Sequence, residues 1–154
     1  MILIDEIIDE DVKQKLEGIS VVNGYLNNVS VLPGYLVHYA HDLMDGKNGV
    51  TFPAVSFEPI EDDPQTDGAK TKSKTTYLMK VVGAVSVQDR ELVNQNINSL
   101  LFDVRRALAM DKFSSSSKAL SLEIGKATFN LPDSKDSYAF FEMTITIIYV
   151  EVWK

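Results

Sequence analysis

Residues 138–153 read YAFFEMTITIIYVEVW and include the most apolar stretch of the chain. Large apolar side chains occupy every second position from 141 to 149, and Glu142, Thr144 and Thr146 stand between them. A period of two residues is typical of a β-strand that buries one face. The stretch therefore predicts a long strand with one buried face and one partly polar face.

The segments before this strand show both strand and helix patterns. Residues 76–87 alternate in the same way and predict a second long strand. Residues 90–110 carry apolar side chains at helical spacing, and Asp89 stands where an N-cap belongs, so we expect an amphipathic helix. Residues 120–131 alternate with a slip of register at Gly125, which predicts a strand with a β-bulge.

The first half of the chain begins with a helix pattern and then becomes irregular. Residues 4–16 place apolar side chains on one side and charged ones on the other, and Gly18 is well placed to end this helix. Turn signals interrupt residues 19–51, so we expect short strands and loops there. Residues 52–58 read as a strand entered through a proline. Residues 59–75 are almost devoid of apolar side chains and predict a mobile loop or arm.

Together these elements predict the α+β class. The chain has 154 residues, of which 45% are hydrophobic, and this is enough for a core. It has no cysteine, which excludes a disulfide scaffold. We therefore expect one domain over residues 1–154, built on a single mixed, mostly antiparallel sheet with two amphipathic helices packed on one face.

Charge is spread unevenly and argues against one class of function. The formal net charge is −7, and a surface that grips nucleic acid needs clustered Lys and Arg, so we expect no direct, sequence-specific nucleic-acid binding. Residues 1–63 hold 12 acidic and 3 basic side chains, whereas residues 64–154 hold 10 and 12. Two interpretations stay open: the acidic face is simply solvated, or it meets a basic patch on a neighbouring copy.

Membrane and export signals are not visible in the sequence. The apolar stretch 143–152 is far shorter than the ~20 residues that a membrane-spanning helix needs, so we expect no membrane segment. Residues 1–6 lack the basic segment of a signal peptide. Because cysteine is absent, a reducing cytoplasm is the simplest place of synthesis.

No group of residues predicts catalysis or a cofactor. If their segment were helical, His38, His41 and Asp42 could offer a metal two imidazoles and a carboxylate, but no further ligand follows at a recognisable spacing, so we expect no metal site. Gly-x-Ser-x-Gly and the two common Gly-rich phosphate loops are absent, and the serine run at 114–117 is typical of a loop. Glu142 is a lone acid on the polar face of its strand. We therefore expect a protein that is not an enzyme and holds no cofactor.

Several segments, taken in order, carry a family resemblance. They are an amphipathic first helix, a strand with Pro53-Ala54-Val55, a polar loop, a long strand, a helix with Ile97-Asn98-Ser99-Leu100-Leu101 and Val104-Arg105-Arg106-Ala107-Leu108, and a final strand ending Ile147-Ile148-Tyr149-Val150-Glu151-Val152. Over residues 4–152 this order resembles the tail terminator family of tailed bacteriophages. The lambda-type terminator and the tail-to-head joining proteins belong to that family.

The resemblance implies a structural virion protein without catalysis. Members of the family form a six-fold ring on the head-proximal end of a finished tail tube, stop its polymerisation and provide the surface that joins the head. The implied partners are further copies of the chain, the tail tube protein and a head-completion or neck protein. The implied location is the phage tail, after synthesis in the cytoplasm of the host bacterium.

A closed ring needs two different, matching patches on each subunit. The polar segment 59–75 can order against the tube or a neighbour, and two arginines lie off the apolar stripe late in the long helix. The candidate intersubunit or tube contacts are Glu61, Asp62, Asp63, Lys70, Lys72, Lys74, Arg105 and Arg106. For the two arginines, a solvated helix end is the alternative to an intersubunit salt bridge.

Two other functions stay open. The chain can be another phage component, from the neck, the tube or the baseplate. It can also be a small-molecule-binding α+β domain in which the polar face of the sheet lines a pocket. The first hypothesis predicts that the protein binds one end of a tail tube, and the second predicts that it binds elsewhere on the tail. The third predicts that it binds a small molecule and no tube.

Overall fold

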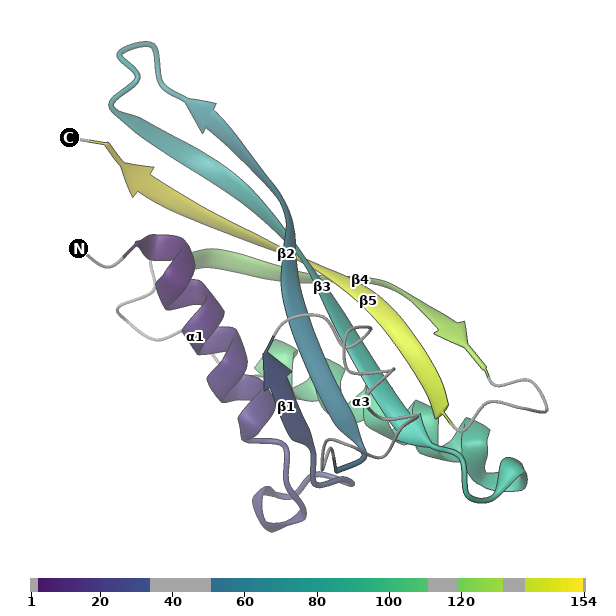
Figure 1. Ribbon diagram of the computed structural model, residues 1–154. Helices are drawn as coiled ribbons and strands as arrows, with labels where there is room; N and C mark the ends of the chain where they lie inside the picture. Colours follow the sequence, from purple (N-terminus) through teal and green to yellow (C-terminus); the bar gives the residue numbers. More distant parts are fainter. Residues whose placement is uncertain (1–2, 34–50, 111–118, 132–137, 154) are drawn as a thin grey trace.

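The chain folds around one mixed sheet, which the computed structural model describes over residues 3–33, 51–110, 119–131 and 138–153 (Figure 1). Within these ranges the elements are α1 (Ile4–Glu17), η1 (Val21–Asn23), β1 (Ser30–Pro33), β2 (Ala54–Thr66), β3 (Lys72–Ser86), η2 (Arg90–Leu92), α3 (Val93–Met110), β4 (Ala119–Asn130) and β5 (Tyr138–Val152). The strand order is β1-β2-β3-β5-β4, with β1 parallel to β2 and the other neighbours antiparallel. The predicted α+β class with a mixed, mostly antiparallel sheet is confirmed.

The two long strands β3 and β5 form the centre of the sheet. Their register places the odd-numbered residues of both strands on one face, which we call the core face; Met79 stands opposite Ile145 and Val81 opposite Met143. All four side chains are buried. The even-numbered residues form the opposite face, which we call the outer face. The buried face predicted for the final strand is therefore confirmed.

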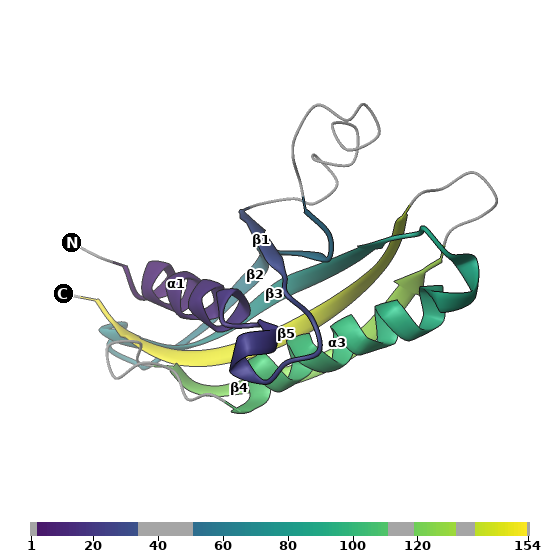
Figure 2. The ribbon, with the colours of Figure 1, turned by 90° about the horizontal axis from the view of Figure 1, so that it is seen from below.

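Both helices cover the core face. In the two views, α1 lies near the end of the sheet that holds the chain termini, and α3 lies toward the other end (Figure 1, Figure 2). One continuous cluster joins the helices to the sheet through Ile8, Val12 and Leu16 of α1 and Ile97, Leu100 and Val104 of α3. The predicted end of the first helix and the predicted cap of the second are also confirmed. Gly18 is the C-cap of α1, and the Asp89 carboxylate accepts from the amide of Glu91 where η2 leads into α3.

The segment 59–75, predicted as a mobile loop, forms regular β-structure instead. β2 continues to Thr66 and β3 begins at Lys72, with Asp62 opposite Tyr77 and Gln65 opposite Lys74. Antiparallel pairing bonds the backbone amides and carbonyls that the two halves of this segment turn toward each other, and it needs no apolar side chains, so the polar composition gave no sign of a strand. The hairpin of residues 59–78, which we call the arm, projects away from the body of the protein (Figure 1).

Two irregularities interrupt the strand ladders. The register shifts between Pro59 and Glu61 in β2, and between Ile124 and Ala127 in β4. The second shift confirms the β-bulge predicted at Gly125. A Cβ atom at Gly125 would overlap the side chain and the carbonyl of Thr144 on β5, so only glycine permits this close approach.

The outer face is partly apolar and partly polar. Ala54, Val82 and Ala84 form a second, small cluster of buried side chains there. Farther along the sheet the Glu58 carboxylate lies 3.3 Å from the Lys80 ammonium. Glu58 is buried, and its Oε2 atom has no hydrogen-bond partner in the part of the chain that the structure describes.

Candidate assembly surfaces

The arm carries six of the eight contact residues predicted from the sequence. All six are exposed, with the acids toward the body of the protein and the lysines toward the tip: Glu61, Asp62, Asp63, Lys70, Lys72 and Lys74. The register sets Asp63 opposite Thr76 and Gln65 opposite Lys74, so the two signs of charge form separate bands along the hairpin. The structure therefore brings these residues onto one projecting element without pairing the acids with the lysines.

Two tyrosines on the core face tie the arm and α1 to the sheet. Tyr149 of β5 donates its hydroxyl hydrogen to Asp62 at 3.0 Å, and Tyr77 of β3 donates to Asp9 of α1 at 2.9 Å. The two rings meet edge to face with centroids 6.3 Å apart. Burial, reinforced by the neighbouring carboxylates, raises the pKa of both phenols above the usual range. Both hydroxyls therefore remain protonated donors at neutral pH.

The tip of the arm is closed by its own polar groups. Asp67 accepts from the amide and from the hydroxyl of Thr71, both at 2.9 Å. These bonds, the amide first, lower the pKa of Asp67 below its usual value. Lys70 has a φ of 55°, which places it in the left-handed region within this turn. The amide of Trp153 donates to the Thr71 carbonyl at 2.7 Å, so the end of β5 supports the tip.

The two arginines of α3 differ in their surroundings. Arg106 donates from Nη1 to the Gly24 carbonyl at 2.8 Å, and its guanidinium lies 4.8 Å from the centroid of the Tyr25 ring. Arg105 is exposed and makes no hydrogen bond or ion pair with the residues that the structure describes. Arg106 therefore binds another segment of its own chain, whereas Arg105 makes no such contact, and both alternatives predicted for Arg105 stay open.

A buried carboxylate that the sequence analysis missed holds residues 20–27 against α3. Asp103 has no exposed surface and accepts from the amides of Leu26 and Asn27 at 3.0 and 2.9 Å. It also accepts from the side-chain amide of Asn27 at 2.8 Å. We call residues 20–27 the clamped loop. The available signal was an acid beside the apolar stripe of α3, since a buried charge needs partners.

Apolar side chains of the clamped loop are exposed. Val22 is 94% exposed, Leu26 62% and Val21 56%, and Phe102, which precedes Asp103 on α3, is 57% exposed. Exposed apolar side chains gathered in one region are typical of interaction sites. With the adjacent arginines they form what we call the α3–loop patch: Val21, Val22, Leu26, Phe102, Arg105 and Arg106.

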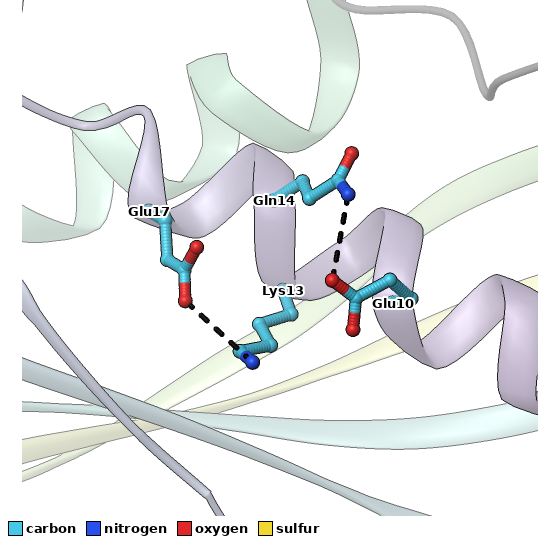
Figure 3. A network of polar contacts seen from close by, with 4 residues as sticks. All are labelled: Glu10, Lys13, Gln14 and Glu17. Carbon is cyan, nitrogen blue, oxygen red and sulfur yellow. Dashed lines mark hydrogen bonds and ion pairs between the residues drawn. The ribbon is translucent and has the colours of Figure 1, made fainter.

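Two side-chain contacts lie along the exposed face of α1 (Figure 3). Lys13 lies 3.9 Å from Glu17, and the Gln14 side-chain amide donates to Glu10 at 3.4 Å. Such pairs contribute only about 0.2–0.5 kcal/mol each and are typical of a solvated helix face. Within the described ranges, the arm acids Glu61 and Asp63 have no ion-pair partner, whereas Glu17 of α1 lies beside Lys13. The carboxylates of Glu61 and Asp63 are therefore not neutralised by a neighbouring cation among these residues.

The predicted histidine and serine features fall outside the described residues, namely His38, His41, Asp42 and the run at 114–117. Among the residues that are described, no group of three side chains could hold a metal ion. One pocket of about 210 Å³ lies between Asn27, Phe52, Ser86 and Asn96, and one of about 320 Å³ lies on the arm beside Lys74 and Val150. Neither pocket is lined by the polar residues Glu142, Thr144 and Thr146 of the final strand.

Comparisons with known proteins assign no family. No model of a known protein family matches the chain, and no curated protein matches its sequence. None of the helices described here has the length and apolar character required to cross a bilayer.

Proposed function

We propose that the chain is a structural subunit of a bacteriophage tail that forms a ring on the head-proximal end of the tail tube. There it stops polymerisation of the tube protein and offers the surface to which a head-completion or neck protein binds. The ring is six-fold in the assembled tail, as the family resemblance implies. The protein acts only by binding other proteins of the tail. This role needs no catalytic step, no metal ion and no cofactor.

The arm is the observation that carries the proposal. Every residue of its β2 half, 59–66, is exposed, so this segment adds little to the core. It is nevertheless ordered by its pairing with β3, which runs from Glu61 to Thr66 beyond the bulge, and by the bond between Tyr149 and Asp62. An exposed element held in one conformation loses less conformational entropy when a neighbour binds it. This property suits a subunit of an assembly.

The order of elements gives further support. The first helix, the strand at Ala54 and Val55, the long central strand, the long helix and the final strand occur in the order on which the resemblance rests. The segment that was expected to be a polar loop lies between the same two strands, although it is paired. The described part of the fold is therefore compatible with the tail terminator architecture from residue 4 to residue 152.

The proposal is tested by negative-stain electron microscopy. Gold-labelled protein is mixed with tail tubes from the same source that were assembled without a terminator, and unrelated tubes serve as the control. We expect label at one end of each tube and a tube length that no longer grows. Label along the shaft, on a neck or at the distal tip would instead assign the chain to another tail component.

Absence of binding to any tube would contradict a role in the phage tail. The small-molecule hypothesis then applies to the pocket between Asn27 and Asn96. A ligand of the folded state raises the melting temperature by mass action, so a thermal-shift screen would detect it.

A further inference from the structure

The α3–loop patch has the composition of a docking surface. Four of its side chains are exposed apolar groups, Val21, Val22, Leu26 and Phe102, and its other two members are the arginines of α3. Phe102 lies three and four positions before Arg105 and Arg106, so these side chains occupy neighbouring positions on one helix surface. An apolar centre with a charged rim is typical of protein–protein interfaces.

Hydrogen bonds within its own chain hold the clamped loop in place, and no second protein is needed for this. The Asp103 carboxylate and the Arg106 guanidinium both bind its backbone, and Ser20 Oγ accepts from the amide of Asn23 at 3.3 Å. These bonds allow Val22 to remain almost fully exposed on a fixed backbone. A preformed loop of this kind retains its geometry on binding, which favours affinity.

The arm carries the complementary composition. Ile60 lies at the β2 bulge, is 49% exposed and is followed by three exposed acids. In the described residues, β1 pairs with β2 only as far as Phe57, so this edge of the arm is open. Pro59 and Pro64 lack the amide hydrogens that another strand would need, and charged side chains also discourage edge pairing. A partner therefore meets this segment through side chains.

We propose that residues 60–63 of one copy dock on the α3–loop patch of the next copy. This inference rests on the proposed function, because it names the contact through which the ring forms. Ile60 supplies the apolar group for the exposed loop side chains, and Glu61 and Asp63 supply the charge opposite to that of Arg105.

The position of the two surfaces makes the contact head-to-tail. The arm and the clamped loop lie at opposite ends of the molecule (Figure 1), so one copy cannot satisfy both by itself. The surfaces differ in charge, and neither is complementary to itself. A contact between two different surfaces is heterologous and produces a closed ring when its rotation closes.

Two variants that each remove one surface test the contact. The arm variant carries Glu61→Lys and Asp63→Lys, and the patch variant carries Arg105→Glu and Val22→Ser. All four positions are exposed, and both variants retain Asp62, Asp103 and Arg106, which hold the arm and the loop. Sedimentation velocity over a range of concentrations measures self-association, and circular dichroism melting verifies that each variant is folded.

We expect the unmodified chain to self-associate and each variant alone to associate at least about 100-fold more weakly, because like charges then face each other. An equimolar mixture of the two variants should regain association. The unaltered arm of the patch variant meets the unaltered patch of the arm variant, and the reversed charges of the other arm and patch are again opposite in sign. A Glu10→Lys/Glu17→Lys control makes the same charge change as the arm variant on the solvated face of α1 and should associate like the unmodified chain.

An unmodified chain that stays monomeric up to about 1 mM would overturn the inference, as would variants that associate normally. The tube-end assay with the same proteins separates this outcome from failure of the proposed function. Tubes capped equally well by both variants would overturn the contact and retain the capping role. Head-to-tail complexes from a chain that binds no tube would retain the contact and contradict the capping role.

Discussion

Asp103 is the residue on which the position of the clamped loop depends. Its carboxylate is buried and receives three N–H donors from Leu26 and Asn27. Hydrogen bonds to a charged group are stronger than neutral ones, and a buried donor left unpaired is costly. One side chain of α3 therefore determines where the exposed apolar residues of the loop stand.

Replacing Asp103 with Ala should lower the free energy of unfolding by about 2–3 kcal/mol, because the amides of Leu26 and Asn27 lose their acceptor. Urea denaturation measures this change, and hydrogen exchange at the two amides should accelerate. Glu91→Ala, which replaces an exposed acid of η2 just before α3, is the matched control. A loss for Asp103→Ala no greater than that of the control would show that the carboxylate does not hold the loop.

Asp9 should make stability depend on pH. Burial raises its pKa from 3.8, and the hydrogen bond from Tyr77 offsets only part of this shift. Because the folded state binds this proton more tightly than the unfolded state, the contribution of Asp9 to stability is full below pH 3.8 and is lost as the pH rises through the folded-state pKa. The difference in unfolding free energy between the unmodified chain and Asp9→Asn, measured from pH 3 to 7 at constant salt, should fall over this interval; a constant difference would contradict the shift.

At the scale of the elements, the β3–β5 pair shows how a glycine can be required within a strand. Gly83 stands opposite Phe141 in the register, and the Phe141 ring occupies the space beside it. A Cβ atom at Gly83 would overlap this ring, which is fully buried and has little room to move. The absence of a side chain at one position thus allows a large one on the next strand.

Gly83→Ala should therefore destabilise the protein by about 1–3 kcal/mol, as overpacking of a core does. Gly68→Ala in the turn of the arm is the control, because no atom lies within 4 Å of its added Cβ. Thermal and urea unfolding of the two variants measure the difference. Equal stability of the two variants would mean that the Phe141 ring moves aside without cost.

The helices could be predicted from the sequence and the arm could not, because helices depend on nearby residues and the arm depends on pairing between two strands. The apolar stripe of α3 and the capping acid Asp89 are local signals, since all of them lie within a few turns. The arm has no such signal. Its strands are held by backbone pairing between residues such as Gln65 and Lys74, and a polar composition is equally compatible with a loop.

At the scale of the whole molecule, the charged surfaces are separated in space. The arm carries its acids near the body and its lysines near the tip, while the α3–loop patch lies at the opposite end (Figure 1). In the proposed ring, the acids contact the next copy. The lysines at the tip lie outside that contact and remain available to another surface of the tail.

Reversing the charge of the tip should weaken capping of the tail tube. For Lys72→Glu/Lys74→Glu we expect about tenfold less label on tube ends, because electrostatic complementarity to the tube would be lost. Lys126→Glu, an exposed position on β4, is the control for a change of charge elsewhere. Unchanged end labelling together with normal self-association would exclude the tip lysines from the contact with the tube.

The sequence by itself determined the two helices, the alternation of the long strands, the bulge at Gly125 and the α+β class, because these depend on periodicity and on nearby residues. It also indicated the charged residues of the arm. Only the tertiary structure decided that those residues lie on a paired hairpin, and that Asp103 and Arg106 hold a loop some 80 residues away in the chain. These features depend on contacts between distant segments, which leave no periodic signal in the sequence.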